Sequence, residues 1–166
     1  MKFYDPKMPI RVSNDASKYA LGAALLQLHE NDWHPSVYAS RSLTTTEVKY
    51  AQIEKECLGI LFGIKRFHQY VYGQKFEVET DHKPLIPIFK KPLSSAPPRI
   101  QRMLLSLTRY DFETKFCAGK DLKIADALSR IKSKIIMESE NPIEFEVCEV
   151  IKNLPMSKRA YKEFVE

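Results

Sequence analysis

Acidic residues that follow apolar segments are the residues of this sequence best suited to chemistry. Asp15 follows the apolar alternation of residues 9–13, and Asp81 follows that of residues 76–80. An acid at the end of a strand is often only a turn residue. Because the pattern occurs twice, we expect the two carboxylates to converge if their strands are neighbours in one sheet.

A long helical repeat supplies a third carboxylate, and two residues compete for that role. Apolar residues recur at helical spacing from Tyr50 to Val71, and Glu54 and Glu56 lie just past opposite edges of this stripe. Periodicity does not choose between them, and either would also suit an ordinary solvated position. A fourth candidate, Asp126, stands among small and apolar residues, where the alternative is a solvated helix face.

Carboxylates crowded into one place repel one another and therefore need cations. Oxygen-only ligands select hard cations such as Mg²⁺ or Mn²⁺. Two such ions about 3.5–4 Å apart can clamp the attacking and leaving oxygens of a phosphodiester, one activating water and the other stabilising the departing 3′ oxygen. The chain has no Gly-rich phosphate loop, G-x-S-x-G or HExxH motif that would indicate another chemistry.

The elements that must position these acids follow from the hydrophobic pattern. Strands are predicted over residues 9–13, 19–28, 35–40, 76–80 and 111–117. Helices are predicted over residues 46–72, from Pro84 onward, around 100–107 and over 122–131. Thr44 and Glu47 have the spacing of a capping box at the start of the long helix, and Gly73 suits its end. The order β-β-β-α-β-α-α-β-α predicts an α/β fold with a mixed sheet and helices on its faces.

Composition narrows the class of protein further. The 166 residues are 44% hydrophobic and 28% charged, which is typical of one globular domain. The net charge is +5, of which residues 1–131 carry +6 and residues 132–166 carry −1, and a basic domain suits a polyanionic partner such as nucleic acid. Three scattered cysteines argue against a disulfide scaffold or a structural zinc site. The absence of a long apolar run predicts no membrane association and no secretion, so we expect a cytoplasmic location.

Five collinear segments within residues 1–131 form long motifs: NDASKYALGAALLQ, HPSVYASRSLTTTEVKYAQIEKECLGI, FEVETDHKPL, PPRIQRMLLSLTRYDFE and AGKDLKIADALSR. Together they closely resemble the ribonuclease H domain of gypsy-type LTR retrotransposon reverse transcriptases. The resemblance implies a ribonuclease H-like fold, with a five-stranded mixed sheet of three antiparallel and then two parallel strands. It also implies a virus-like particle or the nucleus as other locations. Residues 132–166 change in composition and are interpreted as a linker or accessory tail toward the next region of a Pol polyprotein.

The resemblance also assigns the acids. The catalytic and metal-binding positions of the family fall on Asp15, Glu56 rather than Glu54, Asp81 and Asp126. It implies hydrolysis of the RNA strand of RNA–DNA hybrids during reverse transcription, with two Mg²⁺ ions, or Mn²⁺, as cofactors. In this assignment Asp15 bridges both ions, Glu56 and Asp81 hold one, and Asp126 helps to hold the other. Asn14 departs from the family, which usually has Thr or another small residue there.

Contacts to the hybrid are expected at seven residues: Ser17, Arg41, Tyr50, Lys90, Lys91, Arg99 and Arg102. Ordinary solvated basic residues are the alternative for the last four. The expected partners are the RNA–DNA hybrid and the polymerase and connection regions of the same polyprotein. A second hypothesis is a catalytically weak or inactive element-derived domain that binds nucleic acid or acts as a scaffold. Loss of one of the four acids would be the expected sign of such decay, and all four are present.

Overall fold

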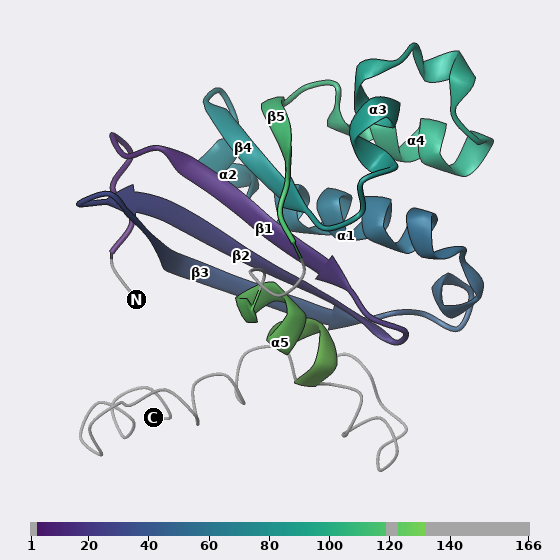
Figure 1. The fold of residues 1–166 in the computed structure, drawn as a ribbon, viewed down its shortest axis with the longest axis horizontal. Helices are drawn as coiled ribbons and strands as arrows, with labels where there is room; N and C mark the ends of the chain where they lie inside the picture. The colour runs from purple at the N-terminus through teal and green to yellow at the C-terminus, as the bar shows by residue number, and fades with distance from the viewer. Residues whose placement is uncertain (1–2, 119–122, 132–166) are drawn as a thin grey trace.

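A five-stranded sheet with helices on both faces forms the body of the computed structural model, which describes residues 3–118 and 123–131 (Figure 1). The strands are β1 (Ile10–Ala16), β2 (Ala20–His29), β3 (Asp32–Ser42), β4 (Lys75–Thr80) and β5 (Asp111–Phe116). The helices are α1 (Gln52–Arg66), α2 (His68–Val71), α3 (Leu85–Lys90), α4 (Pro98–Leu107) and α5 (Lys123–Ile131). Short 3₁₀ turns, η1 (Glu47–Lys49) and η2 (Leu93–Ser95), complete the order.

The sheet has the order β3-β2-β1-β4-β5. β1, β2 and β3 pair antiparallel, whereas β4 pairs parallel with both β1 and β5. This arrangement confirms the predicted mixed sheet of three antiparallel and two parallel strands. Because β1 and β4 are parallel and Ser13 lies opposite Glu79, Asp15 and Asp81 lie at the same end of these two neighbouring strands.

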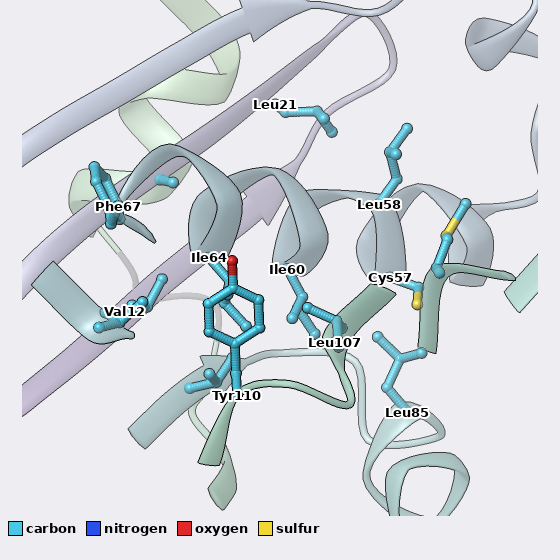
Figure 2. Packing of buried hydrophobic residues seen from close by; sticks show 14 of the residues in the cluster. Val12, Leu21, Cys57, Leu58, Ile60, Ile64, Phe67, Leu85, Leu107 and Tyr110 are labelled. Atoms are coloured by element: carbon cyan, nitrogen blue, oxygen red, sulfur yellow. The ribbon is translucent and has the colours of Figure 1, made fainter. Parts of the chain in front are cut away.

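Helix α1 is fixed against the sheet by its apolar face. Ile60 and Ile64 are fully buried, and Figure 2 shows them near Leu107 and Tyr110 from the α4 region. Full burial of a side chain of this size contributes about 1.5–3 kcal/mol. On its other side α1 lies close to the sheet, where a Cβ at Gly59 would stand 3.7 Å from the carbonyl oxygen of Asp15. The helix is therefore held between β1 and the α4 region, which sets the position of any acid near its start.

The prediction of one continuous helix over residues 46–72 is wrong. The reciprocal Thr44–Glu47 pair forms, with Thr44 N–H donating to Glu47 Oε2 at 2.8 Å, but it lies at the short turn η1 and not at the start of α1. Tyr50 and Ala51 are then extended, with ψ angles of 150° and 153°, and α1 begins only at Gln52. The apolar repeat spans this break because both pieces pack on one core, so the spacing concealed it.

Most other boundaries agree with the prediction to within a few residues. β1 extends to Ala16 and β3 spans Asp32–Ser42, so both are longer than predicted. Gly73 adopts a φ of +76° after α2, as its predicted role as a helix stop requires. The predicted tail, residues 132–166, lies outside the described residues. Within the described ranges, no helix has both the length and the apolar character needed to cross a bilayer.

Candidate active site

Three carboxylates from separate elements meet at the C-terminal ends of the neighbouring strands β1 and β4. Asp15 lies near the end of β1, Glu56 near the start of α1, and Asp81 directly after β4. Each offers an oxygen within 4.8 Å of those of the other two. Asp126 of α5 lines the same cavity, which has a volume of about 520 Å³. The four predicted acids, up to 111 positions apart in the sequence, thus face one space.

Asn14 helps to hold the two strands in register at this edge. Its side-chain amide is buried and donates to the carbonyl oxygen of Glu79 at 2.9 Å. This bond continues the link between β1 and β4 one residue past the backbone pairing of Ser13 with Glu79. The residue that departs from the family pattern therefore contributes to the alignment of Asp15 and Asp81.

The two glutamates that periodicity could not separate have different surroundings. The Glu56 side chain is buried and accepts a hydrogen bond from Gln52 Nε2 at 2.6 Å. Gln52 also donates to the carbonyl oxygen of Ala16 at 3.1 Å, which ties α1 to the end of β1. Glu54 instead pairs with Arg99 of α4 at 2.8 Å, outside the acidic cavity.

Two of the site acids, Glu56 and Asp15, have pKa values above those of ordinary carboxyl groups. Burial, with the added repulsion of Asp15 and Asp81, raises the pKa of Glu56 to about 8. Burial also raises the pKa of Asp15, although a hydrogen bond from Ser129 opposes this effect. Crowded, desolvated carboxylates of this kind are typical of functional sites rather than of structural ion pairs.

The donor set fits hard divalent cations. Asp15, Glu56 and Asp81 present only oxygen atoms, which are the ligands that Mg²⁺ and Mn²⁺ prefer, and a cation would relieve their mutual repulsion. Asp126 stands apart from this compact set. Its Oδ1 pairs with Arg130 Nη2 at 2.6 Å, one turn further along α5. The site therefore combines three crowded acids with a fourth, Asp126, that forms an ion pair.

Four polar residues of the site were not predicted from the sequence. Gln52 donates to Glu56, Ser129 donates to Asp15 at 2.5 Å, and Lys18 and Arg130 line the cavity. Spacing held part of the signal, since Gln52 lies four residues before Glu56 and Ser129 three after Asp126, which places each pair on one helix face. No pattern in the sequence indicated that Ser129 would reach Asp15 on another element.

The predicted hybrid contacts are spread over the molecule. Ser17 lines the acidic cavity, and its hydroxyl oxygen lies 3.0 Å from the carbonyl oxygen of Ala20 and 2.6 Å from that of Ser129, the shorter contact taking its single proton. The other six lie outside the wall of that cavity. Arg41 makes a two-pronged pair with Glu47 at 2.7 and 2.8 Å.

The remaining five lie on or near α3 and α4. The guanidinium of Arg99 stacks 4.1 Å from the ring centre of Tyr50 while it pairs with Glu54. Lys90 and Lys91 line a second cavity of about 460 Å³ beside β5, and Arg102 is exposed on α4. Of the seven predicted contacts, the structure thus brings Ser17 alone to the acids.

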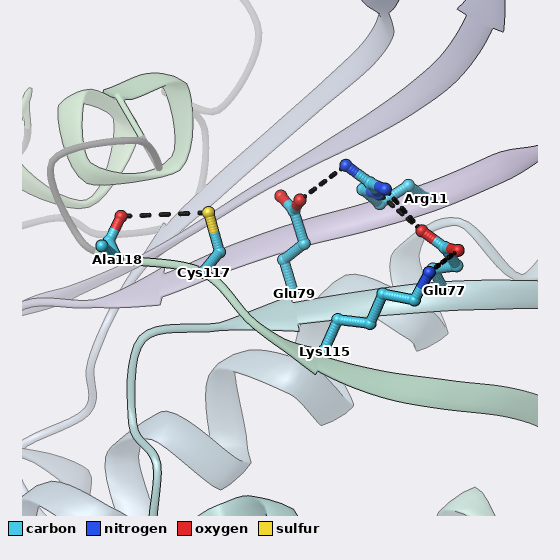
Figure 3. Close-up of polar contacts among 6 residues, drawn as sticks. All are labelled: Arg11, Glu77, Glu79, Lys115, Cys117 and Ala118. Atoms are coloured by element: carbon cyan, nitrogen blue, oxygen red, sulfur yellow. Dashed lines mark hydrogen bonds and ion pairs between the residues drawn. The ribbon is translucent and has the colours of Figure 1, made fainter.

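Upstream of the site, β1, β4 and β5 carry a charged ladder formed by Arg11, Glu77, Glu79 and Lys115 (Figure 3). Arg11 pairs with Glu77 at 2.6 Å and with Glu79 at 2.8 Å, and Lys115 also pairs with Glu77. Burial opposes ionisation of Glu77, but Lys115 and Arg11 outweigh it and lower its pKa. These acids are satisfied by the protein itself and so do not call for a cation.

Comparison with known proteins gives consistent matches. Residues 5–110 match the family model of the RNase H-like domain found in reverse transcriptase. The chain is 41% identical over 123 residues to the retrovirus-related Pol polyprotein from transposon 412 of Drosophila melanogaster, covering 74% of this chain and 10% of the polyprotein. It therefore spans about a tenth of the length of that curated relative.

Solved structures share the fold at low sequence identity. The foamy viral protease-reverse transcriptase in complex with RNA/DNA hybrid aligns with a TM-score of 0.55 and 22% identity, over 68% of this chain and 16% of that one. RNase H1 from Halobacterium salinarum aligns with a TM-score of 0.55 and 12% identity, over 72% of this chain and 93% of that one.

Proposed function

The chain belongs to the family of RNase H-like domains found in reverse transcriptases, and from this premise we propose that it is a metal-dependent endonuclease for the RNA strand of RNA–DNA hybrids. The observation that carries the proposal is the convergence of the Asp15, Glu56 and Asp81 carboxylates, with Asp126 in the wall of the same cavity. Three buried or half-buried acids that crowd together cost the metal-free fold stability, and bound cations would offset that cost.

Each side chain of the site has a distinct part in this activity. Asp15, Glu56 and Asp81 would hold the divalent cations, with Asp126 contributing from α5. The cations, when bound, polarise the scissile phosphate and make water a stronger nucleophile. Gln52 keeps the Glu56 carboxylate directed into the cavity. Lys18 and Arg130 in the cavity wall provide positive charge that favours the approach of a phosphodiester backbone.

The RNA–DNA hybrid is the proposed substrate because the relatives are Pol polyproteins and a fold neighbour was solved with such a hybrid. Recognition would rest on A-like shape and 2′-hydroxyl contacts rather than on base sequence. The polymerase region of the same polyprotein is the proposed partner. Arg41 and Arg99 would have to exchange an existing carboxylate partner for a phosphate, so Ser17 and Lys18 are the better-placed contacts.

Cleavage of a labelled hybrid by the purified chain tests this proposal. With Mg²⁺ or Mn²⁺ the wild type should cut the RNA strand, and a chelator should stop it. Asp81→Asn should reduce cleavage by about 1,000-fold, since removal of a charged ligand costs several kcal/mol of transition-state stabilisation. Asp32→Asn, an exposed aspartate at the start of β3, is the matched control and should cut normally.

Two outcomes would contradict the proposal. Equal cleavage by the wild type and Asp81→Asn would show that a contaminant or another site is responsible. Tight binding of the hybrid by the wild type without metal-dependent cutting would favour the alternative of a nucleic-acid-binding scaffold. Circular dichroism spectra of both variants should match that of the wild type.

A further inference from the structure

Ser129 makes a side-chain contact to the acidic site that the proposed chemistry does not use. It lies on α5 and is fully buried. Its Oγ is 2.5 Å from Asp15 Oδ2 and 2.9 Å from the carbonyl oxygen of Asp126. A hydroxyl has one proton to donate, and the charged, closer acceptor is the stronger one. The geometry therefore favours donation to Asp15.

Gly22 explains why α5 comes close enough for this contact. A Cβ at Gly22 would lie 2.4 Å from the carbonyl oxygen of Ala125 and 2.7 Å from the backbone nitrogen of Ser129. Gly22 is also the residue paired with Asp15 in the β1–β2 ladder. The backbone of α5 thus touches the sheet at the level of Asp15, and any side chain on Gly22 would push it away.

A second contact fixes the same turn of α5. The hydroxyl of Ser17, in the β1–β2 connection, donates to the carbonyl oxygen of Ser129 at 2.6 Å. Among the described residues, Ser129 provides the one side-chain hydrogen bond to the Asp15 carboxylate. The close approach at Gly22, the Ser17 bond and the Ser129 bond all act on one helical turn.

We propose that Ser129 is a positioning residue of the site, whose hydroxyl fixes the orientation of the Asp15 carboxylate for cation binding. On this view α5 delivers two groups, the Asp126 carboxylate and the hydroxyl that orients Asp15. The inference rests on the proposed function, because it assumes that Asp15 holds a cation. If Ser129 served only as a small residue for helix packing, its buried hydroxyl would hydrogen-bond only within α5, to the carbonyl oxygen of Asp126.

Direct measurement of Mn²⁺ binding to the full chain, without nucleic acid, tests the inference. Electron paramagnetic resonance reports free Mn²⁺ during the titration, and thermal unfolding in chelator reports the stability of the metal-free fold. Ser129→Ala should weaken Mn²⁺ binding by about 10–100-fold, as is typical when a partner of a metal ligand is removed. Ser129→Thr, which keeps the hydroxyl, should restore the affinity.

Ser36→Ala is the matched control, because Ser36 is a buried serine of β3 whose hydroxyl donates to Gln27 Oε1 at 3.3 Å, at the other end of β1. It should leave Mn²⁺ affinity unchanged. Ser129→Cys preserves the volume with a weaker donor and gives the same comparison if the alanine variant does not fold. It should bind Mn²⁺ less tightly than the wild type.

The outcomes separate this inference from the proposed function. Wild-type Mn²⁺ affinity in Ser129→Ala or in a folded Ser129→Cys would overturn the positioning role while leaving the nuclease proposal intact. Absence of Mn²⁺ binding and of hybrid cleavage by the wild type would overturn both. Equal loss of affinity in the alanine and threonine variants would mean that packing of α5, and not the hydroxyl, controls the site.

Discussion

Strands β1 and β4 carry two acidic clusters that differ in how their charge is compensated. In the charged ladder, Glu77 meets both Arg11 and Lys115. A few residues further along the same strands, Asp15 and Asp81 meet Glu56. The two clusters share strand direction and backbone register, so they differ in the side chains that face them and in how deeply their acids are buried.

The pKa values follow this difference in partners. Lys115 and Arg11 overcome the effect of burial and lower the pKa of Glu77, whereas burial and two neighbouring acids raise that of Glu56 to about 8. Glu79 is intermediate, because burial raises its pKa even though Arg11 pairs with it. One sheet thus carries acids that are paired within the protein and acids that repel one another, and we propose the second cluster as the one that binds cations.

Removal of one carboxylate from each cluster should have opposite consequences. Glu56→Gln should reduce metal-dependent cleavage by about 1,000-fold, because it removes a charged cation ligand. It should also stabilise the metal-free fold at neutral pH, because burial holds the Glu56 carboxyl in its protonated form at a cost that the neutral Gln side chain does not bear. Glu77→Gln should leave cleavage within a few-fold of the wild type and destabilise the fold by about 1 kcal/mol, the scale of a partly exposed ion pair.

Hybrid cleavage and chemical unfolding in chelator measure the two effects. The predicted difference between the two clusters is contradicted if Glu77→Gln abolishes cleavage as completely as Glu56→Gln. In that case the ladder would be part of the catalytic site and not a structural neighbour of it.

The stability of the metal-free protein should fall as the pH rises from 4.5 to about 8. Glu56 has an ordinary pKa of 4.5 when unfolded and about 8 when folded, so the folded state holds its proton more tightly in this window. Stability from this proton is fully present below pH 4.5 and is lost as the pH rises through 8. Asp15 and Glu79, whose pKa values are also raised, act in the same direction.

Unfolding by urea between pH 5 and 9 in chelator measures this slope, which should reach about 1 kcal/mol per pH unit. The lowered pKa of Glu77 acts below pH 4.5 and in the opposite sense, so it does not mask the effect. Glu56→Gln should flatten the profile, and saturating Mg²⁺ should reverse its sign. A wild-type profile in chelator that is already flat would mean that the site acids do not share the burial described here.

Short-range patterns predicted the strands and the acids that follow them, and the resemblance to a known family supplied the five-stranded mixed sheet that makes the two acids converge. Alternation placed Asp15 and Asp81 after strands, and the strand order then brought them together. The helix break at Tyr50 and Ala51 was missed because the apolar spacing continues across it. A backbone turn that preserves the buried face leaves no trace in periodicity.

Side-chain partners from distant elements lay beyond the sequence patterns. The structure separates Glu54 from Glu56 because Arg99, 45 residues away, pairs with Glu54. The bond from Ser129 to Asp15 joins residues 114 positions apart and depends on the close approach at Gly22. Such contacts need the packed structure, and only the resemblance to a known family selected Glu56 in advance.

Asp126 is intermediate between the two acidic clusters, because it lines the site yet pairs with Arg130. Asp126→Asn should weaken cleavage by about 10–100-fold, less than the loss expected for Glu56→Gln, and the loss should appear mainly as a higher Mg²⁺ requirement. Fold stability should change by only about 0.5 kcal/mol, because the pair with Arg130 is an exposed i,i+4 contact.

A Mg²⁺ titration of the cleavage rate distinguishes two results for Asp126→Asn. A shifted midpoint with a recovered maximal rate would place Asp126 as an auxiliary ligand that Arg130 partly compensates. If Asp126→Asn lost as much cleavage rate as Glu56→Gln at every Mg²⁺ concentration, this role would be contradicted. Asp126 would then be as essential a ligand as Glu56. The pair with Arg130 would then have to open whenever the site is loaded, so the cation would compete directly with the guanidinium for one carboxylate.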